Sequence, residues 1–199
     1  KYIIDPYETG KGGFVPFYLD RKPQNKTERV EYSFDDSPVL NVPGDWNSQA
    51  PELQFYEGSI WYRKTFDVPA EASGKRVFIY FDAANYLTKA YLNGEPLGQH
   101  EGGFTPFNFD ITDKLQEGTN TLIVGVSNTR LRDGIPGMVT DWFNYGGIIR
   151  DVRLVALEPT FIRNFRVQLA RGAEGGPDEA TDEDFDGPPG GEFSNRIAG

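Results

Sequence analysis

The sequence predicts an all-β fold, a β-sandwich or a jelly roll, and three observations lead to this class. Turn formers are frequent, because the 199 residues include 23 glycines and 14 prolines. Short segments rich in β-branched and aromatic residues recur at intervals of about 8–12 residues, separated by turn signals. Apolar residues keep helical i, i+3, i+4 spacing over no window as long as about 12 residues. Two antiparallel sheets packed face to face satisfy these patterns.

Residues 1–50 are expected to be irregular, extended chain laid over a sheet surface. Turn-forming clusters at residues 10–13 and 35–38 interrupt any long element. Aromatic residues lie between these clusters, so we do not expect the segment to be a linker.

Strands are expected from residue 60 onward, where apolar and polar residues alternate with period two. Asn93 and Gly94 form the strongest short hairpin signal in the chain. A turn at residues 117–120 leads into another run of β formers. The expected strands cover residues 60–67, 76–82, 89–92, 107–111, 121–126, 149–155 and 160–169.

Residues 172–199 differ from the rest of the chain and form an acidic tail. They carry eight acidic residues and one basic residue, within a chain whose net charge is −10. Glycine and proline are frequent there and apolar residues are sparse, so we expect disorder. Residues 182–187 match the first half of a calcium-binding loop, but position 12 would be Phe193 rather than Glu. A plain acidic tail is therefore the favoured interpretation.

The composition excludes several classes of site. The chain has no cysteine and one histidine, which rules out disulfides, Cys-ligated zinc, thiol catalysis and a His-rich metal site. We expect neither a metal nor a cofactor. The acidic net charge argues against nucleic acid as a partner. No apolar run approaches the ~20 residues of a membrane span, so no membrane partner is expected.

The first residues lack a signal-peptide pattern. The protein is therefore either cytoplasmic or was processed before this sequence begins. Of these alternatives we favour a periplasmic or secreted location.

Residues 141–148 are the main candidate for a binding site. Asp141 and Asn144 supply hydrogen-bonding side chains, and Trp142 and Tyr145 supply aromatic faces just before an expected strand. A carboxylate accepts hydrogen bonds from two sugar hydroxyls at once, and an aromatic face suits the C–H face of a sugar ring. In the alternative interpretation, the aromatic residues cap the core and the glycines of this segment make a turn.

His100 and Glu101 form a second candidate, because such a pair could provide acid–base catalysis. We favour a structural turn, since Gly102 and Gly103 permit a bend and Glu101 could bond backbone N–H groups. No pair of carboxylates stands in a strand-end context that would support hydrolysis of a glycosidic bond.

An ordered set of motifs resembles the N-terminal sugar-binding domain of family 2 glycoside hydrolases, the group that contains β-galactosidases, β-glucuronidases and β-mannosidases. Their order and spacing match the family over residues 40–157. The motifs are PGDW at 43–46, YEG at 56–58, WYRK at 61–64, FDVP at 66–69, LNG at 92–94, LGQHEGGFTPF at 97–107, DIT at 110–112, NTL at 120–122 and YGGIIRDV at 145–152.

The resemblance implies a galactose-binding-domain-like jelly roll at residues 1–157, packed in the full enzyme beside a catalytic (β/α)₈ barrel. Residues 158–171 would then hold the first strand of a truncated immunoglobulin-like domain. In the family both catalytic glutamates lie in the barrel. This chain would therefore shape the sugar pocket of a parent glycoside hydrolase and would be inactive alone.

The resemblance also implies a role for Asp141, which stands where the family has an aspartate that binds a sugar hydroxyl. We expect Trp142, Asn144 and Tyr145 to complete the substrate-binding set. The expected partners are a β-glycoside and the catalytic barrel, and an apolar surface bared without the barrel could cause self-association.

Two rival functions remain open at this point. The first is a standalone carbohydrate-binding module without hydrolase activity, for which Trp142, Tyr145 or Trp46 would be the stacking platform. The second is a protein-interaction domain whose surface serves only assembly.

Overall fold

The computed structural model describes residues 1–12, 16–28, 30, 32–162, 165 and 167. The chain divides into two units, Lys1–Pro159 and Thr160–Gly199. Every strand in the described part of the chain belongs to the first unit, and so does the candidate site.

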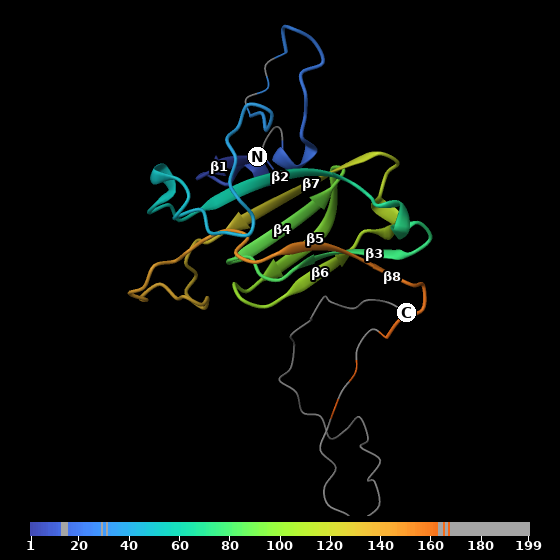
Figure 1. The fold of residues 1–199 in the computed structure, drawn as a ribbon. Coiled ribbons are helices and arrows are strands. Elements are labelled where there is room, and N and C mark those ends of the chain that lie inside the picture. The colour runs from blue at the N-terminus through green and yellow to red at the C-terminus, as the bar shows by residue number, and fades with distance from the viewer. Residues whose placement is uncertain (13–15, 29, 31, 163–164, 166, 168–199) are drawn as a thin grey trace, which may run out of the picture. The chain divides into compact units, whose positions relative to one another are not determined.

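Two antiparallel sheets form the first unit (Figure 1). The five-stranded sheet has the order β1-β2-β7-β4-β5, and the three-stranded sheet has the order β6-β3-β8. The strands are β1 (Tyr2–Asp5), β2 (Ser59–Asp67), β3 (Arg76–Phe81), β4 (Leu87–Leu92), β5 (Glu95–Glu101), β6 (Phe107–Asp110), β7 (Thr119–Ser127) and β8 (Val152–Leu157). Short 3₁₀ turns occupy Thr9–Lys11, Phe17–Leu19, Pro51–Leu53, Ala70–Ala72 and Thr112–Lys114. The prediction of an all-β jelly-roll sandwich is confirmed.

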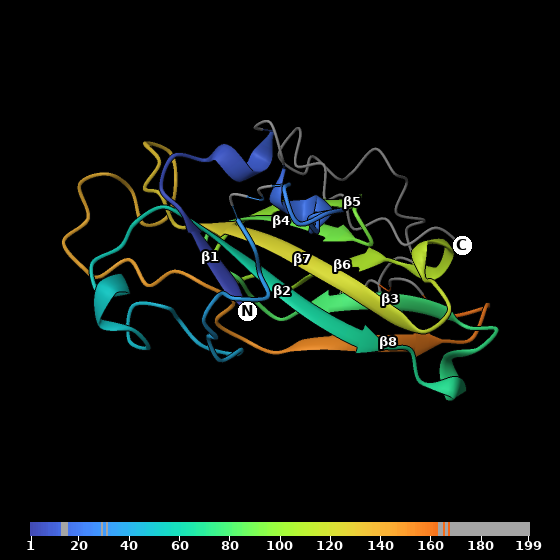
Figure 2. The same ribbon diagram turned by 90° about the horizontal axis from the view of Figure 1, so that it is seen from above.

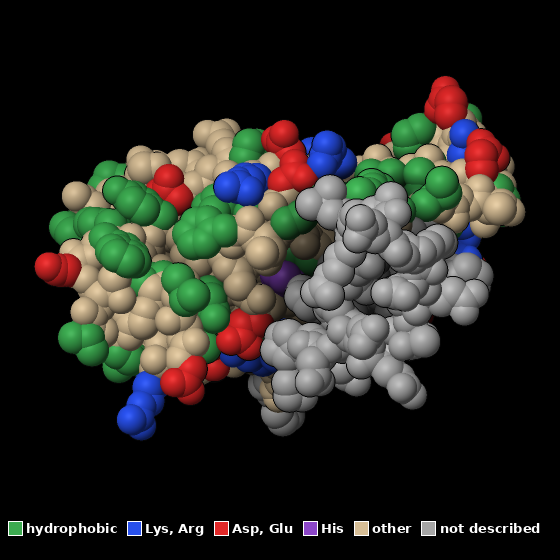
Figure 3. All heavy atoms as spheres, turned by 90° about the horizontal axis from the view of Figure 1, so that it is seen from below, with side chains coloured by type: hydrophobic (Ala, Val, Ile, Leu, Met, Phe, Trp, Pro, Cys, Tyr) green, Lys and Arg blue, Asp and Glu red, His purple; other side chains and the backbone are tan. Residues whose placement is uncertain are grey.

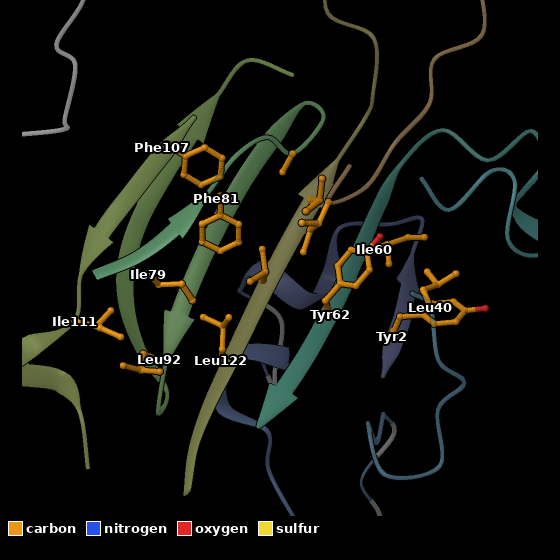
Figure 4. Packing of buried hydrophobic residues seen from close by; sticks show 14 of the residues in the cluster. Tyr2, Leu40, Ile60, Tyr62, Ile79, Phe81, Leu92, Phe107, Ile111 and Leu122 are labelled. Carbon is orange, nitrogen blue, oxygen red and sulfur yellow. The ribbon is translucent and has the colours of Figure 1, made fainter. Parts of the chain in front are cut away.

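The main core lies where the two sheets face each other, because alternate residues of each strand point inward (Figure 4). Ile60 and Tyr62 on β2 belong to this core, as does Leu122 on β7. The rings of Phe81 and Phe107 stack across the second sheet with their centroids 4.8 Å apart. Each large apolar side chain buried in this way contributes about 1.5–3 kcal/mol to folding.

A smaller core covers the outer face of the five-stranded sheet. Phe17 and Phe34 from the N-terminal segment pack there with Trp61 of β2 and Ile123 of β7. In Figure 2 the N-terminal segment, in blue, lies over this sheet. The expectation of extended chain laid over a sheet is therefore confirmed for the described residues of this segment, and both faces are buried in the first four residues of β2 and the last six of β7.

Residues 2–5 form a strand, although only irregular chain was expected over residues 1–50. β1 pairs antiparallel with β2, with Tyr2 opposite Tyr62 and Asp5 opposite Ser59. The buried Asp5 carboxylate then accepts hydrogen bonds from Gly10 N and Trp61 Nε1. The pairing is long-range, so the local sequence carries little sign of it.

Two further expectations about strands were wrong in detail. Residues 95–101 form β5, which follows the expected hairpin at Asn93 and Gly94, whose φ values are 53° and 83°. β8 begins at Val152 rather than at residue 149. The sequence did not predict β5 because it contains Pro96 and Gly98, and both residue types are poor strand formers.

The C-terminal expectations reach beyond what the structure shows. Of the expected strand at 160–169, residues 160–162, 165 and 167 are described and lie in no strand. The acidic tail at 172–199, with its calcium-like segment 182–187, lies outside the described residues. Within the described ranges, no helix has the length and apolar character needed to cross a membrane. Those ranges also hold no cluster of three or more metal-ligating side chains.

Candidate functional site

The candidate site is built on the loop that joins β7 to β8 at one end of the sandwich (Figure 1). Two asparagines, Asn128 at the start of this loop and Asn144 in its second half, form hydrogen bonds with each other. Asn128 Nδ2 donates a 2.7 Å hydrogen bond to Asn144 O, and Asn144 Nδ2 donates in return to Asn128 O. Asn128 Oδ1 accepts a 2.9 Å bond from Gly58 N, which joins the loop to the start of β2. The two bonds between Asn128 and Asn144 are buried and the bond from Gly58 is part-buried, so water competes little for them.

Asn85, which lies between β3 and β4, adds a third asparagine side chain to this hydrogen-bond network. Its Nδ2 donates to Asn144 Oδ1 at 3.1 Å and to Tyr145 O at 2.5 Å. Both polar atoms of the Asn144 side chain therefore form hydrogen bonds within the protein, and the residue is 5% exposed. Asn144 also lines the depression described below, so the structure gives it a supporting role in the loop, and its contact with a ligand stays a prediction.

Asn47 ties the loop to the segment ahead of β2. Its Oδ1 accepts a 2.9 Å hydrogen bond from Gly146 N, and its Nδ2 donates to Leu53 O at 2.9 Å. Gly146 lies flat on Trp46, where a Cβ atom would come within 2.1 Å of the indole ring. Trp46 is 0% exposed, so the expectation that it could serve as a stacking platform for a sugar was wrong.

Asp141 and Trp142 are exposed at the edge of a shallow depression of about 240 Å³. Arg130 and Glu57 line the same depression. Arg130 Nε donates to Glu57 Oε1 at 2.9 Å. No hydrogen bond reaches the Asp141 carboxylate from the part of the chain that the structure describes. Asp141 thus presents a free acceptor to whatever fills the depression.

Exposed apolar side chains are frequent in the same loop as Asp141, and we term them the apolar rim. Its members are Ile135, Met138, Val139, Trp142, Phe143 and Tyr145. On the face drawn in Figure 3, hydrophobic side chains gather over the end of the sandwich where this loop lies. The ring of Phe143 lies between those of Tyr145 and Phe55, at centroid distances of 5.0 and 5.8 Å. Large contiguous apolar patches on a protein surface are typical of contact sites.

His100 and Glu101 lie on β5 and serve the fold. The His100 ring stacks on Phe107 at 4.2 Å, and its Nε2 lies 3.1 Å from Thr105 Oγ1. Burial lowers the pKa of His100, and this effect outweighs the opposing influence of the Gly102 backbone and of Glu101. Neighbouring residues on a strand point to opposite faces, so the two side chains cannot act as one acid–base pair. They belong to a strand rather than to the turn that was expected.

The structure thus brings together Asp141, Trp142 and Asn144 at one depression, with the Asn144 side chain buried, and leaves Tyr145 exposed outside its lining. Sequence reasoning missed the buried asparagines 47, 85 and 128 and the pairing of Arg130 with Glu57. The available signal was weak: Asn85 and Asn128 each stand just after an expected strand, where a side chain can bond the next turn.

The comparisons with known proteins agree on one family. A protein-family model described as "Glycosyl hydrolases family 2, sugar binding domain" matches residues 11–158 of this sequence. A β-galactosidase of Thermoanaerobacter pseudethanolicus is 36% identical over an alignment of 151 residues that covers 71% of this chain and 20% of that protein. A β-glucuronidase of Bacteroides fragilis is 34% identical over an alignment of 131 residues that covers 64% of this chain and 19% of that protein.

Solved structures point the same way. A β-glucuronidase from an uncultured Clostridium species aligns with a TM-score of 0.66 and 30% identity, covering 80% of this chain and 28% of that one. The chain spans about a fifth of the length of the two curated relatives. It carries the motifs, the sandwich and the family match of one domain of such proteins. The chain therefore belongs to the family 2 glycoside hydrolases as their non-catalytic N-terminal sugar-binding domain.

Proposed function

We propose that this domain forms one wall of the sugar pocket in a full-length family 2 glycosidase, with Asp141 accepting hydrogen bonds from substrate hydroxyls. The observation that carries the proposal is the open Asp141 carboxylate on the edge of the depression. Trp142, which lines the same depression, and Tyr145, four residues after Asp141 in the loop, offer aromatic faces, being 63% and 51% exposed. A carboxylate next to an aromatic face suits the hydroxyl and C–H sides of a sugar ring.

The size of the depression supports a shared site. Its volume of about 240 Å³ falls below the roughly 300–1,000 Å³ of a complete small-molecule pocket. The remaining contacts to the sugar must therefore come from elsewhere. We assign them to the catalytic barrel, and we propose that the barrel covers the apolar rim.

The proposed chemistry of the whole enzyme is hydrolysis of a β-galactoside or β-glucuronide, the classes named for its relatives. Hydrolysis needs two carboxylates on either side of the glycosidic bond, roughly 5–9.5 Å apart. The carboxylate of Glu57 lines the same depression as Asp141 but is paired with Arg130 at 2.9 Å. We therefore assign both catalytic groups to the barrel and a binding role to this domain.

Kinetics of the full-length enzyme test the role of Asp141. Replacing Asp141 by Ala removes a charged acceptor, and hydrogen bonds to charged groups contribute about 1.5–3 kcal/mol. We expect kcat/KM for the natural β-glycoside to fall about 10- to 100-fold. Steady-state assays on purified wild-type and variant enzyme measure the change.

Asp133→Ala is the matched control, because Asp133 is an exposed acid of the same loop that does not line the depression. It should leave kcat/KM unchanged. Wild-type kinetics in Asp141→Ala would remove Asp141 from the sugar site and overturn the proposal.

A second candidate function, independent glycan binding, is favoured by the exposed ring of Trp142. Calorimetric titration of the 199-residue chain with sugars separates the two functions. Millimolar or tighter binding that Trp142→Ala abolishes would support an independent module. Binding that needs the full-length enzyme would support the shared pocket.

A further inference from the structure

We propose that Arg130 is a positioning residue that holds Asp141 in its sugar-binding place, an inference that rests on the proposed function. Arg130 Nη1 donates to Thr140 O at 2.8 Å, and its Nη2 donates to Trp142 O at 2.9 Å. The guanidinium therefore bonds the backbone immediately before and immediately after Asp141. The residue that contacts sugar is fixed from both sides by one side chain.

Glu57 fixes the guanidinium in turn. Its two carboxylate oxygens accept hydrogen bonds from Arg130 Nε at 2.9 and 3.3 Å, and these bonds orient the plane of the guanidinium group. The side chain of Arg130 is 18% exposed and that of Glu57 is 40% exposed, so water competes only partly for these bonds. All three nitrogens of the guanidinium thus have partners, on a segment next to β2 and on two residues of the β7–β8 loop.

Arginine suits this task better than other residues. Its planar group presents five N–H donors in fixed directions, which lets it bond a carboxylate and two separate carbonyls at once. A lysine ammonium is a compact charge without that fork, so it could keep the pairing with Glu57 but not both carbonyl bonds.

The loop around Asp141 needs such a tether. The described backbone bonds within its tip are local, from Gly134 N to Leu131 O and from Thr140 N to Gly137 O. The asparagine network holds the base of the loop rather than this stretch. Without Arg130, the backbone on either side of Asp141 would lose two hydrogen bonds and, with them, its connection to Glu57. A displacement of about 1 Å in a binding group can lower the rate about 100-fold.

The test is a double-mutant cycle in the full-length enzyme. We expect Arg130→Gln to raise KM and to lower kcat/KM about tenfold or more, with Arg130→Lys intermediate. In an Asp141→Ala background, Arg130→Gln should cost little further, because the residue it positions is already gone. Glu57→Gln should give a smaller loss of the same kind. Arg132→Gln, which alters an exposed arginine of the same loop, is the matched control and should behave as wild type.

Three outcomes would overturn the inference. An unchanged KM in Arg130→Gln, beside an impaired Asp141→Ala, would show that Asp141 acts without Arg130. If Arg130→Gln lowered kcat/KM equally in the wild-type and Asp141→Ala backgrounds, Arg130 would serve only the general fold. If Arg130→Gln does not fold, Glu57→Gln and Arg130→Lys allow the same comparison. Wild-type kinetics in Asp141→Ala alone would instead refute the proposed function and this inference with it.

Discussion

Buried asparagine side chains determine the conformation of the candidate site at the scale of single residues. Asn128 is 0% exposed and bonds the backbone of two distant residues, Gly58 and Asn144. An amide can both donate and accept, so one side chain satisfies an N–H group and a carbonyl that would otherwise be buried without partners. Such groups cost more when left unpaired than their bonds contribute when made.

Asn128→Ala should therefore lower the free energy of unfolding of the 199-residue chain by about 2–6 kcal/mol, since it leaves two buried or part-buried backbone groups without partners, at about 1–3 kcal/mol each. Urea denaturation followed by tryptophan fluorescence measures the change. Asn41→Ala, at an exposed asparagine outside the network, is the control and should stay within about 0.5 kcal/mol of wild type. Equal effects in the two variants would contradict the structural role of Asn128.

His100 gives the molecule a pH dependence of known sign. Its burial against Phe107 lowers its pKa from the usual value of 6.5, so folding favours the neutral ring. The stability that this contributes is complete above the unfolded pKa and is lost as pH falls through the folded pKa. We expect the free energy of unfolding to fall between about pH 7 and pH 5.

His100→Phe keeps an aromatic ring against Phe107 and removes the titrating group. Urea denaturation at several pH values should show a shallower slope over this range in the variant than in the wild type. Identical slopes would mean that other groups cause the loss of stability.

At the scale of elements, the alternation of apolar residues predicted the strands that form the middle of the sandwich. β2 and β7 pair along their whole length, from Ser59 opposite Ser127 to Asp67 opposite Thr119. Their inward and outward faces follow the period of two that the sequence displays. Both strands are long and rich in β formers, so local preference and tertiary packing agree.

The strands that sequence reasoning missed lie at the sheet edges. β1 has four residues and depends on a partner more than 50 residues away, and β5 contains Pro96 and Gly98. Edge strands pair on one side, so they tolerate residues that a central strand excludes. The existence of β1 is decided by long-range pairing, which a local pattern does not encode, whereas β5 pairs locally with β4 and was missed because of its composition.

The candidate site was predictable in part for a related reason. The family motif at 145–152 and the residue types before it located Asp141, and the loop position follows from the flanking strands. The inward turn of Asn144 and the fork of Arg130 were not predictable. Both depend on which backbone groups meet after the sheets pack, as with Asn47 and Gly146, which are 99 residues apart.

At the scale of the whole molecule, the apolar rim predicts self-association of the 199-residue chain. Val139 is 99% exposed, and its apolar neighbours on the rim share one end of the sandwich. Burying such surface contributes roughly 25 cal/mol per Å², and the rim is proposed to be covered by the barrel in the full-length enzyme. We expect sedimentation velocity to show a weight-average mass that rises with concentration.

A matched pair of substitutions decides whether the rim causes that association. Val139→Lys places a charge at the most exposed residue of the rim, and desolvating it would oppose contact between copies. Val39→Lys makes the same change at an exposed valine that borders a separate depression between β2 and β8. Val139→Lys should shift the chain toward monomer, and Val39→Lys should leave the association as in the wild type. Equal shifts in both would assign the association to general solubility, and a chain that is monomeric at every concentration would show that the rim is too small to bind a copy of itself.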